Sequence, residues 1–149
     1  MVGAGGVGSA IAASLAAAGI GRLVLADTST ASAAALAQRI GQHYPKLDVA
    51  AGANDPAGFD LVVNATPLGM QDGDPLPLDI SRVSPNAMVG EVVMRTEITP
   101  FLAAARARGC ATLVGTDMLI EQIPAYLEFF GFPTTTAAHL RSLACLPYG

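Results

Sequence analysis

Short apolar runs alternate with longer segments of mixed character along the whole chain. The clearest runs, which have the length of strands buried on both faces, lie at 22–27 (RLVLAD), 60–65 (DLVVNA), 87–93 and 111–114, with a weaker one at 47–50. Segments with helical length and spacing lie at 6–18, 31–42, 101–108, 118–130 and 136–146. This alternation predicts an α/β fold, in which helices cover both faces of a doubly wound parallel sheet in three αβα layers.

Capping signals mark several of the expected helix ends. Gly19 follows the first helix at a typical C′ position, and the Ser/Thr cluster at 28–30 can cap the second. Thr99-Pro100 places an N-cap and an N1 proline before the helix at 101–108. Asp117 can cap the next helix, in which Pro124 predicts a kink.

The segment Gly3-Ala4-Gly5-Gly6-Val7-Gly8 fits the pattern G-x-G-x-x-G. The first glycine permits a tight turn, the second lets a pyrophosphate approach the backbone, and the third lets helix and strand pack closely. The helix that follows would present unpaired N–H groups to the phosphates. The pattern therefore predicts a Rossmann-like dinucleotide site. Met1-Val2 leaves room for only part of a first strand, so we expect the chain to be cut from something longer.

Asp27 ends the second apolar run, 19 positions after the last glycine of the pattern. A carboxylate there can accept hydrogen bonds from the adenine-ribose hydroxyls. It would also repel a 2′-phosphate, and the following residues (TSTAS) contain no Arg or Lys to receive one. NAD is therefore expected as the preferred cofactor, with NADP possible. The alternative is that Asp27 only caps a turn at the strand end.

Composition limits the class of protein. A length of 149 residues, with 52% hydrophobic and 13% charged residues, fits one compact domain. The net charge of −4 gives no basic field for nucleic acid or an anionic membrane, and no apolar run is long enough to span a bilayer. Cys110 and Cys145 match no metal spacing and suggest reduced core thiols, so we expect a cytoplasmic protein without a metal site. As a separate expectation, the protein is a monomer or a homodimer.

A more specific signal is the string NATPLGM at 64–70, directly after a predicted strand, which resembles the shikimate/quinate dehydrogenase family. Two further stretches are similar to that family: GEVVM at 90–94 with TPFL at 99–102, and GTDMLIEQ at 115–122. The resemblance covers essentially the whole chain, but only the family's C-terminal, cofactor-binding domain. It implies hydride transfer between NAD(P) and a ring hydroxyl or ketone of a small polyol acid such as shikimate or quinate.

The resemblance also implies roles for individual residues. It assigns cofactor binding to Gly3, Ala4, Gly5, Gly6, Val7, Gly8, Asp27, Thr28, Asn64, Thr66, Pro67, Leu68, Val92, Gly115 and Met118. Within that set, residues 4–7 would bind the pyrophosphate and Asp27 with Thr28 would bind the ribose. Val92, Gly115 and Met118 would surround the nicotinamide ring. Gln122 matches a residue whose amide binds substrate, and the alternative is an exposed helical glutamine.

The chain departs from the family pattern beside the expected substrate pocket. Met94 replaces a usual Tyr, and Ile123, followed by Pro124, replaces a usual Gly or Ala. The family's catalytic Lys/Asp pair belongs to an N-terminal substrate domain, which we expect to be missing here, and the sole lysine, Lys46, sits in a turn before a strand. Two other hypotheses stay open: an NAD-binding module without catalysis, and a related folate-type or glutamyl-tRNA-type dehydrogenase.

Overall fold

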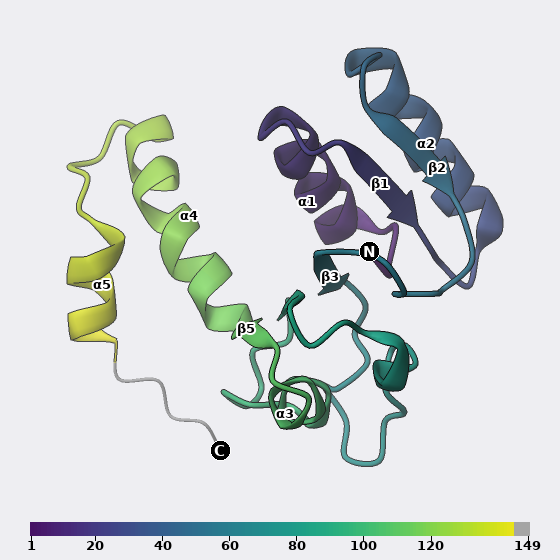
Figure 1. Cartoon of the computed structure of the whole chain (residues 1–149). Helices are drawn as coiled ribbons and strands as arrows, with labels where there is room; N and C mark the ends of the chain where they lie inside the picture. The colour runs from purple at the N-terminus through teal and green to yellow at the C-terminus, as the bar shows by residue number, and fades with distance from the viewer. Residues whose placement is uncertain (145–149) are drawn as a thin grey trace.

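The structure is a computed structural model that describes residues 1–144 (Figure 1). Its strands are β1 (Arg22–Leu25), β2 (Asp48–Ala51), β3 (Leu61–Asn64), β4 (Met88–Glu91) and β5 (Ala111–Leu113). Its helices are α1 (Gly6–Ala17), α2 (Thr30–His43), α3 (Pro100–Ala107), α4 (Gly115–Phe129) and α5 (Ala137–Leu143), with a short 3-10 turn η1 (Ile80–Arg82).

All the strands run parallel, in two ladders that share a central segment. One ladder pairs β1 with β2, with Arg22 opposite Asp48, and the other has the order β3-β4-β5, with Leu61 opposite Met88. Residues 1–3 lie between β1 and β3, because Val2 bridges to both Ala26 and Asn64. The resulting order, β2-β1-(1–3)-β3-β4-β5, confirms the predicted parallel α/β fold.

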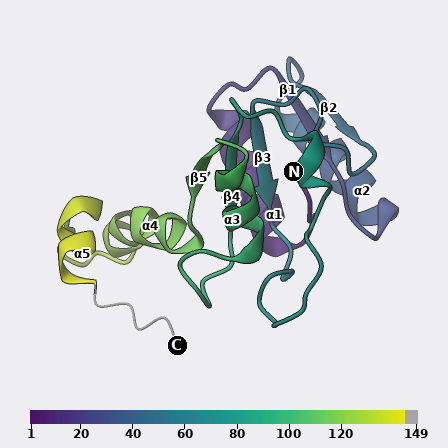
Figure 2. The ribbon, with the colours of Figure 1, turned by 60° about the horizontal axis from the view of Figure 1, so that its bottom comes forward.

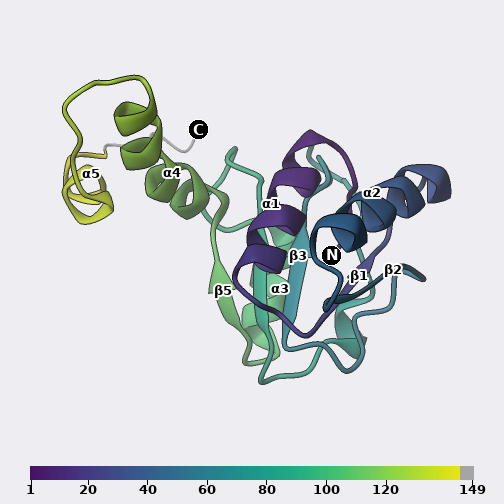
Figure 3. The ribbon, with the colours of Figure 1, turned by 90° about the horizontal axis from the view of Figure 1, so that it is seen from above.

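Helices cover both faces of this sheet. Figures 2 and 3 show α1 and α2 on one face and α3 on the opposite face. Small side chains let α1 lie close to the strands, and Ala12 and Ala16 are buried in a cluster that also contains Leu25 and Leu36. A second cluster, around Phe101, packs α3 against β3 and β4. These two clusters hold the carboxyl ends of the strands in place, and the candidate site lies at that edge.

The pair α4 and α5 extends from the sheet as an arm (Figure 1). Arg141 of α5 forms ion pairs with Asp117 and Glu121 of α4. Aromatic side chains lie exposed near the end of α4, with Phe129 81% accessible.

The predicted capping residues occupy their expected positions at most helix ends. The Ser29 hydroxyl accepts a hydrogen bond from the Ser32 amide, Thr99 caps α3 ahead of Pro100, and Gly19 has a φ of +81° just after α1. The prediction for α4 was wrong at its start, because the helix begins at Gly115 and Asp117 lies in its first turn. The Asp117 amide donates to the Val114 carbonyl at 3.1 Å, so the first turn has already begun before Asp117.

Two other sequence expectations concern the end of the chain. Helix α5 ends at Leu143, and the predicted continuation through Leu146 lies outside the described residues, as does Cys145. Cys110 is buried with a free thiol, as expected.

Candidate functional site

The glycine loop joins residues 1–3 to α1, and its glycines have different surroundings. Gly3 has a φ of +100°, and a Cβ added there would lie 2.6 Å from the Ala65 carbonyl oxygen. A Cβ on Gly8 would lie 2.2 Å from the Gly3 oxygen. No atom lies within 4 Å of the position a Cβ would take on Gly5. Packing therefore requires the first and last glycines, whereas the middle one leaves open space above the backbone.

The N-terminus of α1 opens into that space. Gly5 is the N-cap and supplies no side-chain cap, and the first turn carries no acidic residue. The amides of Gly6, Val7 and Gly8 are first-turn donors, which have no partner within the helix. Such donors, together with the positive end of the helix dipole, favour a phosphate or another anion.

Asp27 lies at the end of β1 beside the glycine loop. Its Oδ2 accepts a hydrogen bond from the Ala4 amide at 2.7 Å, and its Oδ1 accepts one from the Ser29 amide at 2.8 Å. These two backbone donors hold the pKa of Asp27 below its usual value, so the carboxylate is charged at neutral pH. The turn-capping role is therefore present, and the Ala4 amide is already committed to Asp27. The loop amides left for phosphate are those of 5–8.

The loop after β3 is built around the side chain of Asn64. Asn64 is fully buried, and its Oδ1 accepts from the amide and hydroxyl of Thr66 while its Nδ2 donates to the Leu68 carbonyl. The Thr66 hydroxyl also accepts from the Leu68 amide. Asp74 then fastens the next turn through the amides of Gly69 and Gln71. Asn64 thus acts from beneath the loop, whereas Thr66 and Pro67 face the open side.

Two hollows follow the carboxyl ends of the strands on either side of this loop. The first, which we call the β1 hollow, has a volume of about 740 Å³ and is lined by residues that include Gly5, Asp27, Thr28, Thr66 and Leu68. The second, the β4 hollow, has a volume of about 600 Å³ and is lined by residues that include Gly6, Val7, Val92 and Met94. Both share Gly5, Ala65, Thr66 and Pro67, so they form one continuous surface across the glycine loop.

The two hollows differ in charge. None of the described residues that line the β1 hollow is a lysine or an arginine, and Asp27 gives it a negative charge. The β4 hollow carries Arg95, whose guanidinium donates to the Met70 carbonyl and lies 3.7 Å from the Asp72 carboxylate.

Other residues of this site were missed from the sequence. Ala53, Asn54 and Pro77 line the β1 hollow, and Met70, Gln71 and Arg95 line the β4 hollow. The position of Ala53 and Asn54 just after β2 was an available signal, because ligands of doubly wound sheets bind at the carboxyl ends of strands.

Glu91, at the carboxyl end of β4, is the most unusual of the missed residues. It is 4% exposed, and neither carboxylate oxygen has a hydrogen-bond partner. Burial raises the pKa of Glu91, and the nearby side chains of Thr99 and Asn64 oppose that rise only partly. Asn64 lies opposite Glu91 in the ladder, so this acid lies on the adjacent strand beside the residue that organises the Thr66 loop.

The remaining predicted residues lie around α4. Gly115 is buried against Val93, and Met118 lines a neighbouring apolar hollow with Ile11 and Glu121, which shares Val92 with the β4 hollow. Gln122 accepts a hydrogen bond from the Tyr126 hydroxyl at 2.6 Å within α4. The structure thus gathers the glycine loop, Asp27, Thr28, Thr66, Pro67, Leu68 and Val92 along one surface, and leaves Met118 and Gln122 beyond it.

Among residues 1–144, no cluster of His, Cys, Asp and Glu could hold a metal ion. No helix in that range has the length and apolar character needed to cross a bilayer.

Comparison with known sequences found close relatives, although no family model matches the chain. A quinate/shikimate dehydrogenase (NAD(+)) of Corynebacterium glutamicum (strain R) is 43% identical over 136 residues, which cover 87% of this chain and 48% of that protein. A shikimate dehydrogenase (NADP(+)) of Acidiphilium cryptum (strain JF-5) is 40% identical over 147 residues, which cover 97% of this chain and 52% of the relative. The chain therefore spans about half the length of the curated relatives it matches.

Solved structures give the same result. The quinate dehydrogenase of Corynebacterium glutamicum in complex with NAD superposes with a TM-score of 0.84 and 38% identity, over 95% of this chain and 52% of that one. The 5-ketofructose reductase of a Gluconobacter strain (CHM43) superposes with a TM-score of 0.82 and 27% identity, over 95% of this chain and 53% of that one.

Proposed function

Because this chain belongs to the shikimate/quinate dehydrogenase family, we propose that it is the NAD(P)-binding half of a dehydrogenase and that it prefers NAD. The observation that carries the proposal is the continuous surface formed by the β1 and β4 hollows, with open space over Gly5 and free amides at the start of α1 between them. A dinucleotide is an elongated ligand with a doubly charged centre, and this surface has a matching form.

Each part of the cofactor has a counterpart on this surface. The adenosine half fits the β1 hollow, where Asp27 and Thr28 would accept hydrogen bonds from ribose hydroxyls. The pyrophosphate fits the amides of Gly6 and Val7. The nicotinamide half fits the β4 hollow, against Pro67 and Val92. When bound, the cofactor supplies a hydride acceptor or donor, and the residues of this chain hold and orient it.

The preference for NAD rests on the charge of the β1 hollow. Asp27 is ionised at neutral pH, and no cation lines that hollow among the described residues, so a 2′-phosphate would meet only a like charge. Relatives named for NAD and relatives named for NADP both match the chain, so the proposed preference rests on Asp27 and its surroundings. Calorimetry on the 149-residue chain should show NAD binding at least about tenfold more tightly than NADP.

A pair of variants tests this preference. Replacing Asp27→Ala together with Thr28→Arg should shift the ratio of affinities toward NADP, because the repulsion is removed and a guanidinium can pair with the phosphate. Equal affinities of the unmodified chain for both cofactors would contradict the role of Asp27 in selectivity.

A separate variant tests the location of the site. Gly5→Val should fold normally, since no atom lies within 4 Å of the new Cβ, but it should weaken NAD binding by more than about tenfold because the side chain occupies the phosphate position. Gly21→Val is the matched control, because its Cβ is equally free and Gly21 lines neither hollow. If folded Gly5→Val bound NAD as tightly as the unmodified chain, the assignment of the glycine loop to the cofactor site would be wrong.

For the substrate, we propose a small polyol acid of the shikimate or quinate type, acted on by the longer protein. The relatives with these activities support the reaction class. Lys46 cannot serve as the proton acceptor for this reaction, because it precedes β2 at the amino ends of the strands, opposite the hollows. We therefore expect the 149-residue chain alone to bind NAD and to turn over neither acid, which absorbance at the NADH band would measure. Turnover abolished by Lys46→Ala would contradict this assignment.

A further inference from the structure

The Thr66 loop, which spans residues 65–70, forms the part of the surface that both hollows share. Residues 65–67 line the β1 hollow and the β4 hollow alike, whereas Leu68 lines only the first and Met70 only the second. A shift of this loop would therefore change both hollows at once. The groups that hold the loop in place decide how well an elongated ligand can bind across it.

Two buried side chains hold the two ends of the Thr66 loop. At its start, the Asn64 side chain accepts a hydrogen bond from the Thr66 amide and donates one to the Leu68 carbonyl, both at 3.0 Å. At its end, Gly69 lies against Thr99, because a Cβ added to Gly69 would be 3.8 Å from both the Cβ and the Cγ2 of Thr99. Asn64 and Thr99 are both fully buried, so bulk water does not compete for these contacts.

Glu91 approaches both of these side chains from β4. Val62 and Val89 belong to the cluster that packs α3 against the sheet, and side chains two positions apart on a strand share a face. Asn64 and Glu91 follow in the same register and therefore point to the α3 side of the sheet. The Glu91 carboxyl lies close enough to Thr99 and Asn64 for both to influence its ionisation, yet neither of its oxygens has a hydrogen-bond partner among the described residues.

The surroundings of Glu91 favour a neutral carboxyl, because burial raises its pKa. The start of α3 would favour a charged carboxylate, but Pro100 has no amide, and the Leu102 amide already donates to the Thr99 hydroxyl. The described charged side chains of the loops and helices around this edge do not shift the pKa of Glu91; they are Asp72, Asp74, Arg95, Glu97, Asp117, Glu121 and Arg141. Desolvation is therefore the dominant influence on its charge.

Loss of the proton changes what the Glu91 carboxyl needs from its neighbours. A buried carboxylate is costly unless donors surround it, and Asn64 and Thr99 carry the side-chain donors beside Glu91. The Asn64 Nδ2 already donates to the Leu68 carbonyl. A charged Glu91 therefore competes with the Thr66 loop for the same amide group.

We propose that Glu91 is a positioning residue for the cofactor: its neutral carboxyl leaves Asn64 bonded to the Thr66 loop, and its ionisation draws the Asn64 amide away from Leu68. The loop then loosens, both hollows change shape, and the affinity for NAD falls as the pH rises. By linkage, binding of NAD to the charged form takes up protons. The effect on NAD rests on the cofactor site proposed above, whereas the effect on the loop does not.

The first experiment needs no cofactor. Hydrogen exchange of the 149-residue chain, corrected for the intrinsic rate at each pH, gives the protection of the Thr66 and Leu68 amides, which donate to Asn64 and to the Thr66 hydroxyl. From about pH 5 to about pH 9, this protection should fall at least about tenfold in the unmodified chain and stay constant in Glu91→Gln, which remains neutral. Glu97→Gln makes the same change at an exposed acid nearby and should behave like the unmodified chain.

The second experiment measures NAD binding by calorimetry over the same pH range. The affinity should fall at least about fivefold in the unmodified chain and in Glu97→Gln, and Glu91→Gln should remove most of this fall. The charge of Asp27 stays constant in this range, because its pKa is lowered. Titrations in two buffers of different ionisation enthalpy should show proton uptake at about pH 8, and this uptake should be absent in Glu91→Gln.

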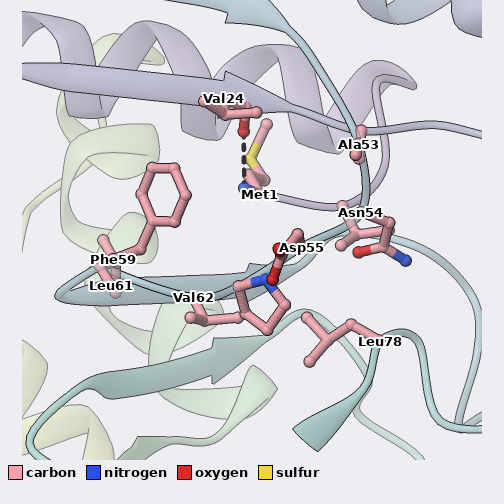
Figure 4. A pocket seen from close by; sticks show the side chains of 12 residues that line it. Met1, Val24, Ala53, Asn54, Asp55, Phe59, Leu61, Val62 and Leu78 are labelled. Atoms are coloured by element: carbon pink, nitrogen blue, oxygen red, sulfur yellow. Dashed lines mark hydrogen bonds between the residues drawn. The ribbon is translucent and has the colours of Figure 1, made fainter. Parts of the chain in front are cut away.

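The Met1 amine titrates in the same range, and the same comparison separates it from Glu91. Burial lowers the pKa of this amine from 8.0 to about 6, and it donates to the Val24 carbonyl in a pocket that includes Phe59 and Leu78 (Figure 4). None of the described residues that line this pocket belongs to the Thr66 loop. Glu91→Gln keeps the amine, so any pH dependence that the amine causes remains in that variant.

Three results would overturn the proposal: protection of the loop that does not depend on pH in the unmodified chain, an equal fall of protection in Glu91→Gln, and a constant affinity for NAD while the protection falls. If NAD bound at no pH, the proposed cofactor site would be wrong, and the protection of the loop alone would decide the role of Glu91. Should Glu91→Gln fail to fold, the fall in protection must follow the titration of the Glu91 carboxyl carbon in NMR spectra of the unmodified chain, and a mismatch would contradict the proposal.

Discussion

The two halves of the candidate site are built from different materials. On the side of β1, the ligand surface is backbone: a glycine loop, the first turn of α1 and the amides that Asp27 holds in place. On the side of β4, the surface rests on buried polar side chains, where Asn64 supports the Thr66 loop and Glu91 lies beside Asn64 on the adjacent strand. The half beside β1 is shaped by residues without side chains, and the half beside β4 is shaped by the hydrogen bonds of buried side chains.

This difference determines how each half can fail. A backbone site fails when an added atom collides with it, and the penalty is steric. A site that rests on buried polar groups fails when one partner is removed, because the others are left without hydrogen bonds in an apolar environment. The following substitutions separate the two modes of failure.

The largest effect is expected at the last glycine of the loop. Gly8→Ala places a Cβ 2.2 Å from the Gly3 oxygen, and neither backbone segment can move without disturbing the strand at 1–3. We expect a loss of at least about 3 kcal/mol in the free energy of unfolding, measured by urea denaturation. Gly5→Ala, which adds the same methyl group where no atom lies within 4 Å, should change it by less than about 1 kcal/mol. Equal effects would contradict the steric account.

Removal of the Asn64 side chain should have the next largest effect. Asn64→Ala leaves the Thr66 amide, the Thr66 hydroxyl and the Leu68 carbonyl without their shared partner. We expect a loss of about 2–4 kcal/mol in the free energy of unfolding, together with weaker NAD binding as the loop loses its conformation.

Asn54→Ala is the control for Asn64→Ala. Asn54 is exposed and donates one hydrogen bond to the Pro77 carbonyl, so its loss should cost less than about 1 kcal/mol. Similar losses of unfolding free energy at both positions would show that the burial of Asn64 does not raise the cost of removing its side chain.

A pH series should then reveal Glu91. Its pKa is raised in the folded state, so its contribution to stability is fully present below the pKa of the unfolded chain and is lost as the pH rises through the folded pKa. Glu91→Gln, which stays neutral, should therefore be more stable than the unmodified chain at pH 8, and the difference should shrink toward pH 4. An unchanged pH dependence in the variant would mean that folding does not raise the pKa of Glu91.

The smallest effect is expected at Asp27. Its pKa is lowered in the fold by the amides of Ala4 and Ser29, so its contribution is present above the unfolded pKa and is lost as the pH falls through the folded value. Asp27→Asn should cost about 1 kcal/mol at pH 7 in thermal or urea unfolding, and less at pH 3. A cost that does not depend on pH would place the effect in packing rather than in charge.

The same contrast explains what could be predicted from the sequence. The parallel α/β fold, the glycine loop and the caps at Ser29 and Thr99 follow from local patterns, because glycine spacing and capping residues act on their immediate neighbours. The approach of Asn64 and Thr99 to Glu91 escaped notice, because it depends on the register of β3 with β4 and on the return of the chain into α3. Met118 lines a hollow that adjoins the β4 hollow at Val92, and its expected place beside the nicotinamide ring stays a prediction.

The position of residues 1–3 at the centre of the sheet also constrains the order of folding. Val2 has one pairing partner at Ala26 and the other at Asn64, so the residues closest to the N-terminus complete their pairing only after the chain through β3 is available. During synthesis, residues 1–3 must therefore wait for partners that are made much later, and loops of very different length must close around them. The two ladders become one sheet only at that late step, and until then each keeps an unpaired edge that could join another chain.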